Sequence, residues 1–155
     1  VAPAGGGTPG GTPRAAAGDA SAAAQGPGPN RLYEIAYDQF RRGSFATART
    51  GFTDLLTRFP TSDLAPDAAF YVAESFASER NAAAADSAYR AVVTRYPQSP
   101  RAATALYKRA QASRDAAESR TLYQQLVRDF PRSDEAELAR EALKQPARPA
   151  PARRP

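Results

Sequence analysis

The chain has 155 residues, a formal net charge of +5, and neither histidine nor cysteine. Histidine is the commonest general acid or base at neutral pH, and the cysteine thiolate is a common nucleophile and metal ligand. This composition therefore argues against an enzyme and excludes a cysteine metal site. No segment approaches the roughly 18 apolar residues of a membrane span. The chain begins at Val1 without a signal-peptide pattern, so we expect a processed or truncated product.

Both ends of the chain have low sequence complexity. Residues 1–30 hold eight of the ten glycines and five of the fourteen prolines, and residues 146–155 consist only of Pro, Ala and Arg. Such segments have too little apolar side chain to offset the entropy of ordering them. We therefore expect a disordered linker at 1–30, one folded domain at 31–145 and a disordered tail at 146–155.

The charge of the predicted domain is nearly balanced. Residues 31–145 carry 17 basic and 15 acidic side chains, with both signs interleaved. A nucleic-acid interface concentrates positive charge on one element, so we expect no nucleic-acid partner. Five arginines are expected to form ordinary solvated surface: Arg41, Arg42, Arg80, Arg109 and Arg114.

An aromatic–proline pair recurs three times, in TRFPTS at 57–62, TRYPQS at 94–99 and VRDFPRS at 127–133. A proline cannot extend a helix and restricts the residue before it, so each copy predicts a helix end. The prolines are spaced 37 and 34 residues apart. Three matched helix ends predict three repeated units.

Each unit divides into two amphipathic segments with helical periodicity. The predicted helices cover 31–42, 45–58, 65–79, 82–95, 100–113, 115–129 and, after the third unit, 134–144. Gly43 ends the first helix, and Ser44, Ser99 and Ser133 are expected to cap the helices that follow them. Ser62 or Asp63 is expected to do the same after the first aromatic–proline pair.

Small and aromatic residues alternate through the units in a fixed register. Ala36, Ala73 and Ala110 would let paired helices approach closely, while Phe52, Tyr89 and Tyr123 would fill the space between neighbours. Ala48 and Ala85 extend the small positions by one turn, and Ser119 takes that place in the third unit. Only 13 residues separate Ala110 from Tyr123, against 16 in the other units, which predicts a three-residue deletion between two helices, in 113–117.

This pattern resembles the tetratricopeptide repeat (TPR). The residues that carry the resemblance are Leu32, Ala36, Gly43, Ala48, Phe52 and Pro60, then Ala69, Ala73, Ala85, Tyr89 and Pro97, then Leu106, Ala110, Tyr123 and Pro131. One short helix pair cannot bury its apolar face alone, but stacked pairs make a continuous core. The expected fold is an all-α solenoid of three helical hairpins with a C-terminal capping helix.

A second resemblance is narrower. The segment LAPDAAFYVAESF at 64–76 is similar to the C-terminal repeat domain of the Tol-Pal system proteins YbgF/CpoB, through Pro66, Phe70, Tyr71, Ala73 and Glu74. This resemblance implies a periplasmic protein that contacts TolA and links outer-membrane constriction to septal peptidoglycan synthesis during cell division. The trimerising coiled coil of that family is absent from this chain, and no cofactor is implied.

Two other envelope roles fit the same architecture. The outer-membrane assembly lipoprotein BamD also resembles a TPR array with FP and YP repeat ends, although it has more repeats and a lipidated N-terminal cysteine. A generic envelope scaffold is the other option, because TPR arrays serve many partners. A heptad region upstream of Val1 would favour the YbgF/CpoB interpretation, and a lipobox cysteine would favour the BamD-like one.

The first helix of each TPR pair lines the concave face, so it carries the candidate partner-binding residues. These are Tyr33, Tyr37, Phe70, Glu74, Tyr107, Lys108 and Gln111. Tyr33, Phe70 and Tyr107 recur every 37 residues, and their rings would accept apolar side chains of a peptide. Glu74, Lys108 and Gln111 would pair with its polar groups. The alternative is that the rings only pack between neighbouring helices, as we expect for Tyr71.

Catalysis by carboxylates is the remaining enzymatic hypothesis. Glycoside cleavage needs two carboxyl groups that converge across a cleft. Here Asp67, Asp134 and Glu135 stand at predicted helix starts, where a negative charge favours the helix dipole. The sequence therefore predicts a non-catalytic protein with no metal site.

Overall fold

The computed structural model describes residues 26–145, which form helices and no strand. The helices are α2 (Pro29–Arg41), α3 (Phe45–Arg58), α4 (Ala65–Ser78), α5 (Ala82–Arg95), α6 (Pro100–Ala112), α7 (Ala116–Asp129) and α8 (Asp134–Lys144). Every predicted helix is present, with ends shifted by at most two residues. The first begins at Pro29 because proline is favoured in the first turn, where no amide donor is needed. Most of the predicted linker and the tail at 146–155 lie outside the described residues.

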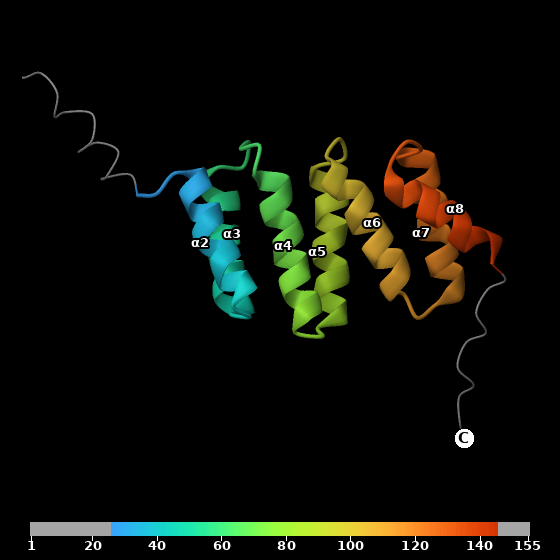
Figure 1. The fold of residues 1–155 in the computed structure, drawn as a ribbon, viewed down its shortest axis with the longest axis horizontal. Helices are drawn as coiled ribbons and strands as arrows, with labels where there is room; N and C mark the ends of the chain where they lie inside the picture. Colours follow the sequence, from blue (N-terminus) through green and yellow to red (C-terminus); the bar gives the residue numbers. More distant parts are fainter. Residues whose placement is uncertain (1–25, 146–155) are drawn as a thin grey trace, which may run out of the picture.

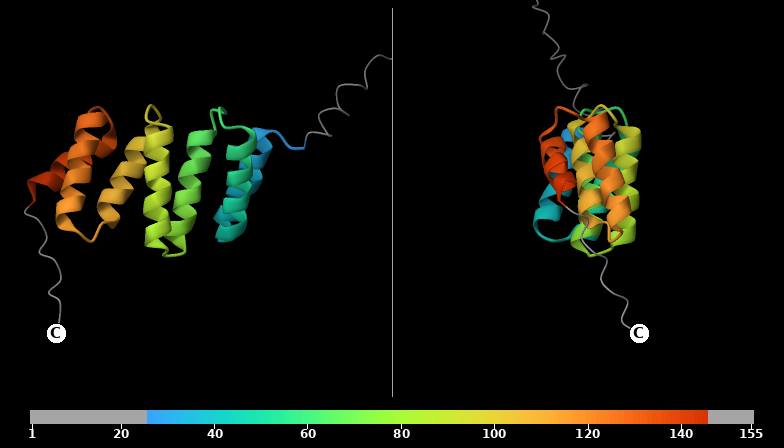
Figure 2. Two further views of the ribbon diagram at one scale, coloured as in Figure 1. Left: turned by 180° about the vertical axis from the view of Figure 1, so that it is seen from behind. Right: turned by 90° about the vertical axis from the view of Figure 1, so that its right-hand side faces the viewer.

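The helices form three antiparallel hairpins in a row, α2/α3, α4/α5 and α6/α7, with α8 packed against the last one (Figure 1). The view from behind shows the same row, and the view from one end shows the helices overlapping one another (Figure 2). Besides its chain neighbours, each first helix contacts the next first helix, α2 with α4, α4 with α6 and α6 with α8. In the described chain no such contacts join α3, α5 and α7. The first helices therefore lie on the crowded inner side of an all-α, TPR-type solenoid.

The predicted small positions are buried at the helix contacts. Ala36, Ala73 and Ala110 are at most 1% exposed. At the α2–α3 contact, a Cβ atom added to Gly51 would lie only 2.9 Å from the Ala36 Cβ atom. The first hairpin is therefore packed so closely that glycine is needed opposite alanine.

The aromatic positions of the second helices differ along the row. Phe52 and Tyr89 are buried as predicted, but Tyr123 is only half-buried. The buried residues of α7 are instead Leu122 and Leu126. A single helix of 11 residues follows α7, where a whole hairpin follows α3 and α5, so less of the surface of α7 is covered.

The helix caps were predicted in part. Ser99 and Ser133 cap α6 and α8 by accepting hydrogen bonds from backbone amides, as expected. Ser44 is the N-cap residue of α3 as predicted, but its side chain makes no capping hydrogen bond. Neither Ser62 nor Asp63 is the N-cap residue of α4, because the chain makes a further turn before that helix begins.

The three-residue deletion falls at the end of α6. The connection of α6 to α7 has three residues, as have the other connections within hairpins. In the register fixed by the buried alanines, however, α6 ends three residues before the point where α4 ends. Nearly one helical turn is missing there, and α6 diverges from α5 toward this end (Figure 1). No helix in the described part of the chain is long and apolar enough for a membrane span.

Candidate functional site

Aromatic rings fill the interface between the first two hairpins. We call this group the aromatic cluster: Tyr33, Tyr37, Phe40, Phe45, Phe52 and Tyr71. The Tyr71 ring lies at its centre and also contacts Phe70, so that five rings surround it at centroid distances of 5.1 to 6.3 Å. These distances suit offset and edge-to-face contacts between aromatic side chains. Tyr71 therefore belongs to the core, as the sequence predicted.

A charged pair borders the aromatic cluster on the inner side. Arg101 of α6 pairs with Asp67 of α4, and its guanidinium lies 4.9 Å from the ring centre of Phe70. Burial, and next the negative charge of Asp67, raise the pKa of the Tyr33 hydroxyl. The Tyr33 hydroxyl therefore stays neutral and able to donate a hydrogen bond at physiological pH.

The three aromatics that recur every 37 residues occupy different environments. Tyr33 and Tyr107 are half-buried on the inner side, whereas Phe70 is 5% exposed and packs against Tyr89. No ring contact joins Tyr33, Phe70 and Tyr107 to one another within residues 26–145. On α6 the Gln111 amide donates to the Tyr107 hydroxyl over 3.0 Å. Tyr33 and Tyr107 are thus partly exposed, while Phe70 lies beneath the surface.

Two of the polar residues predicted for the groove, Glu74 and Lys108, form an ion pair, and Gln111 lines the same cavity as Lys108. Glu74 accepts a hydrogen bond from the Tyr89 hydroxyl and pairs with Lys108 at 3.2 Å. Burial, and next the hydrogen bond to Glu74, raise the pKa of Tyr89. The structure therefore brings Glu74, Lys108 and Gln111 together near the second and third hairpins, apart from Tyr33 and Tyr37.

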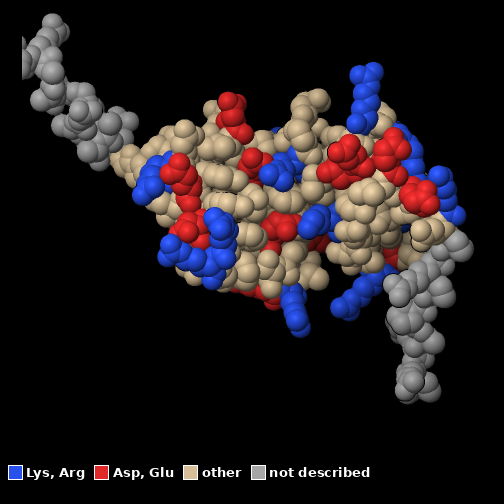
Figure 3. Space-filling view, in the orientation of Figure 1, with Lys and Arg blue, Asp and Glu red and all other residues tan. Residues whose placement is uncertain are grey.

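A cavity of about 410 Å³ opens between α4, α5 and α6. We call it the cationic cleft. Four alanines, Ala77, Ala82, Ala85 and Ala112, line it together with Arg80, Asp86, Tyr89, Lys108, Arg109 and Gln111. Figure 3 shows a notch at the lower edge of the molecule, between α5 and α6, with Lys or Arg side chains projecting on both sides. The predicted site included only Lys108 and Gln111 of these residues.

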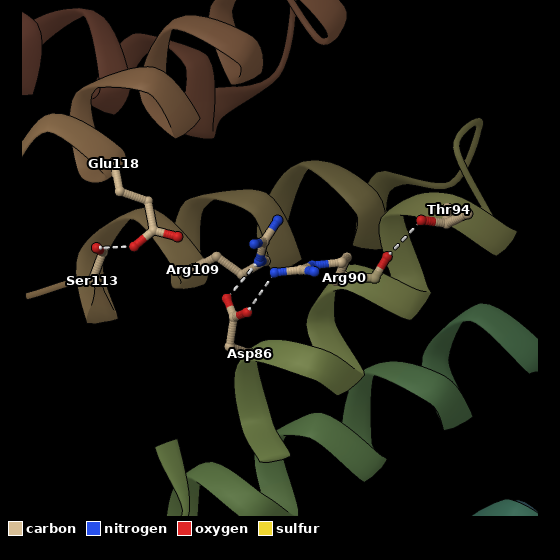
Figure 4. A network of polar contacts seen from close by, with 6 residues as sticks. All are labelled: Asp86, Arg90, Thr94, Arg109, Ser113 and Glu118. Carbon is tan, nitrogen blue, oxygen red and sulfur yellow. Dashed lines mark hydrogen bonds and ion pairs between the residues drawn. The ribbon is translucent and has the colours of Figure 1, made fainter. Parts of the chain in front are cut away.

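Two arginines converge on Asp86, a carboxylate that lines the cleft (Figure 4). Asp86 accepts from the Arg109 Nε atom at 2.7 Å through one oxygen, and its other oxygen lies 3.2 Å from an Arg90 Nη atom. Arg109 is only 8% exposed. The prediction that Arg109 is solvated surface is therefore wrong, because Asp86 across the interface partners its charge.

The two interfaces use equivalent positions 37 residues apart. Phe40 and Phe45 of the first interface become Ala77 and Ala82 in the second, Tyr71 becomes Lys108, Val72 becomes Arg109, and Gly43 becomes Arg80. The first three changes remove rings, and the last three add positive charge. A comparison of the repeats at this spacing would have revealed the cleft from the sequence, because the same positions carry the aromatic cluster in the first interface.

The model of the YfiO family, described as outer membrane lipoproteins, matches residues 27–148. The chain belongs to this family. The match covers all seven described helices, and it supports an envelope protein of TPR type without supporting YbgF/CpoB specifically. It favours the BamD-like alternative over the Tol-Pal interpretation. No curated protein matches the chain significantly.

Within residues 26–145, no three His, Cys, Asp or Glu side chains are placed to hold a metal ion.

Proposed function

We propose that this chain is a non-catalytic protein-interaction module of outer-membrane protein assembly, with a role like that of BamD on the periplasmic side of the envelope. The observation that carries the proposal is the family match over the whole hairpin array. The architecture supports it, because stacked hairpins present a long inner surface on which a protein segment can lie.

The proposed partner surface lies on the first helices. It combines Tyr33 and Tyr37 of α2 with Glu74 of α4 and with Tyr107, Lys108 and Gln111 of α6. Tyrosine suits such a surface, since its ring packs against apolar side chains while its hydroxyl still makes hydrogen bonds. Phe70 supports this surface from below through its contact with Arg101.

The Tol-Pal role remains the second candidate, on the basis of the segment at 64–76. In that case the partner would be a TolA-like protein together with the peptidoglycan synthesis machinery. The two candidates predict different consequences when the protein is lost. The first predicts a defect in the assembly of outer-membrane proteins, and the Tol-Pal role predicts a defect in outer-membrane constriction.

Depletion in the organism that encodes the chain separates these roles. If the proposed function is correct, the abundance of folded β-barrel proteins in the outer membrane falls before any division defect is seen. Normal β-barrel levels with delayed constriction of the outer membrane would favour the Tol-Pal role. Quantitative mass spectrometry of outer membranes and timed microscopy of dividing cells measure the two outcomes.

Variants on α2 and α6 test the proposed surface. Tyr37→Ala and Tyr107→Ala should each weaken rescue of the depleted cells, while circular dichroism still reports the helical fold. The matched control is Ile35→Ala, because Ile35 is a 44% exposed apolar residue that points to the opposite side of α2 from Tyr33. Full rescue by both tyrosine variants, at normal protein levels, would place the partner elsewhere.

A further inference from the structure

Packing alone does not account for the cationic cleft. A hairpin stack is most stable when its interfaces are filled, because an empty cavity loses both apolar burial and dispersion contacts. The first interface meets this demand with Phe40, Phe45 and Tyr71. At the equivalent positions, Ala77, Ala82 and Lys108 leave a space of about 410 Å³. The early end of α6 removes a further turn that would have bordered this space.

Arg80 at the margin of the cleft has an unfavourable backbone conformation. Its φ angle is +60°, in the left-handed region, and its counterpart in the first hairpin is Gly43 with φ +79°. Glycine adopts this conformation without strain, whereas a residue with a Cβ atom does not. The Arg80 side chain makes no hydrogen bond or ion pair with any residue that the structure describes. No hydrogen bond or ion pair of this side chain within the described residues therefore offsets the strain of the Arg80 backbone.

Positive charge exceeds negative charge around the cleft. Three cations line the cavity, Arg80, Lys108 and Arg109, against one carboxylate, Asp86. Just outside it, Arg90 pairs with Asp86 and Glu74 pairs with Lys108, so the excess of two positive charges is unchanged.

The carboxylates already in place leave donors free. Both oxygens of Asp86 accept hydrogen bonds, and Arg109 donates only through Nε (Figure 4). Neither Nη atom of Arg109 takes part in a hydrogen bond within residues 26–145. Donors of Arg109 and Arg80 thus remain available for an anion.

We propose that the cationic cleft is a binding site for an acidic side chain, Asp or Glu, carried by a segment of a partner protein. A planar guanidinium matches a carboxylate with two parallel hydrogen bonds, and Arg80 and Arg109 supply two such groups. The alanines that line the cleft suit the small or apolar residues beside the acidic one. The site rests on the proposed function only in that the partner is a protein, and it is distinct from the tyrosines of α2.

A titration of the full chain tests this site directly. The probe is the capped peptide Ac-Ala-Glu-Ala-NH2, followed by nuclear magnetic resonance of the backbone amides at low ionic strength. Shifts should concentrate at the ends of α4 and α6 and the start of α5, and they should weaken as salt is added. The matched probe Ac-Ala-Gln-Ala-NH2 has the same shape without the charge. Its affinity should be lower than that of the Glu peptide by roughly tenfold or more.

Two variants separate binding from folding. Arg80→Gly should lower the affinity for the Glu peptide roughly tenfold while it raises the melting temperature, a combination that a merely structural role would not give. Ala82→Phe restores the ring of the first interface and should close the cleft to the peptide. Gly43→Arg places arginine at the equivalent turn of the first interface, which Phe40, Phe45 and Tyr71 occupy, so it should leave peptide binding unchanged.

Three results would overturn the proposal. One is equal binding of the Glu and Gln peptides, and another is unchanged affinity in both Arg80→Gly and Ala82→Phe. The third is binding of inorganic phosphate at the same amides without binding of the Glu peptide, which would make this a small-anion site. None of these results depends on outer-membrane assembly, so failure of the proposed function in depleted cells would be seen separately.

Discussion

The first and second hairpin interfaces are built on one register and have opposite character. In the first, Phe40 and Tyr71 are in ring contact at 5.1 Å and the space is filled. In the second, their counterparts are Ala77 and Lys108, and a cleft remains. Because both interfaces share this register, the difference shows how one repeat fold supports a filled contact and an open one. The substitutions that matter are those at the contact positions between hairpins.

The ion pairs across the two interfaces differ as well. Arg49 of α3 pairs with Glu79 at 2.6 Å and lies over the Phe76 ring, at the end of α4. The deletion removes the corresponding end of α6, and the counterpart of Arg49 is Asp86, which pairs with Arg109 instead. In the first interface the second helix of the hairpin supplies the cation, and in the second interface it supplies the carboxylate. The partner residue also lies one to two turns earlier on the first helix of the next hairpin.

The largest effect is expected from Tyr71→Ala. It removes the ring at the centre of the aromatic cluster and should lower the free energy of unfolding by about 3–5 kcal/mol. Lys108→Ala at the equivalent position should cost less than about 1 kcal/mol, because that side chain is 42% exposed and its ion pair is solvated. Urea denaturation followed by circular dichroism measures both. Equal losses would show that the two interfaces are not as different as their contacts indicate.

A smaller loss is expected from Gly51→Ala in the first hairpin. The new Cβ atom would lie 2.9 Å from that of Ala36, so α2 and α3 must move apart, at a cost of about 1–3 kcal/mol. The second hairpin has Ala88 at the equivalent position. There the reverse change, Ala88→Gly, should cost about 1 kcal/mol through helix propensity alone. A stabilising effect of Gly51→Ala in thermal denaturation would contradict the close approach.

Tyr89→Phe removes a hydroxyl that Phe52, its counterpart in the first interface, does not have. The lost hydrogen bond to Glu74 should cost about 1–2 kcal/mol at neutral pH, since that carboxylate keeps its contact with Lys108. The same substitution serves as a pH test.

The pKa of Tyr89 is raised by burial and then by its hydrogen bond to Glu74, above the value of about 10 in an unfolded chain. Its contribution to stability is therefore complete below pH of about 10 and is lost as the pH rises through the folded-state pKa. The natural protein should lose stability more steeply than Tyr89→Phe in denaturant titrations at alkaline pH. Parallel curves for the two proteins would show that Tyr89 does not titrate with unfolding.

The smallest effect is expected at the turn beside the cleft. Arg80→Gly should raise the free energy of unfolding by about 1 kcal/mol, because glycine accepts the positive φ angle that strains arginine. The reciprocal change in the first hairpin, Gly43→Arg, should lower it by a similar amount. Differential scanning calorimetry of the two variants beside the natural chain measures both shifts, and shifts of the same sign would contradict the assignment of strain to Arg80.

The helices were predictable because their signals are local. The aromatic–proline pairs, the periodic alanines and the serines before α6 and α8 act within a few residues of where they stand. Ser44 stands at the N-cap position that the sequence predicted, yet its side chain makes no capping hydrogen bond. Position in the repeat predicted the burial of Phe52 and Tyr89, and it failed for Tyr123 because the number of helices that follow also matters.

The candidate site was predicted less completely. Tyr33, Tyr37, Glu74, Tyr107, Lys108 and Gln111 lie on the first helices as expected, and their role in binding stays a proposal. The sequence did not reveal that Arg109 is buried against Asp86, because 23 residues separate these two and only the stacking of α6 on α5 brings them together. It also did not show that the missing turn of α6 would widen an opening beside α5.

By itself, the sequence determined the number, order and register of the helices, since helix periodicity and helix ends are encoded by neighbouring residues. The tertiary structure alone decided which interface between hairpins is closed and which is open. That outcome depends on pairs of side chains far apart in the chain, whose rings fill the first interface and whose alanines and cations leave a cleft in the second. Packing is a property of both partners at once, so one helix read alone does not contain it.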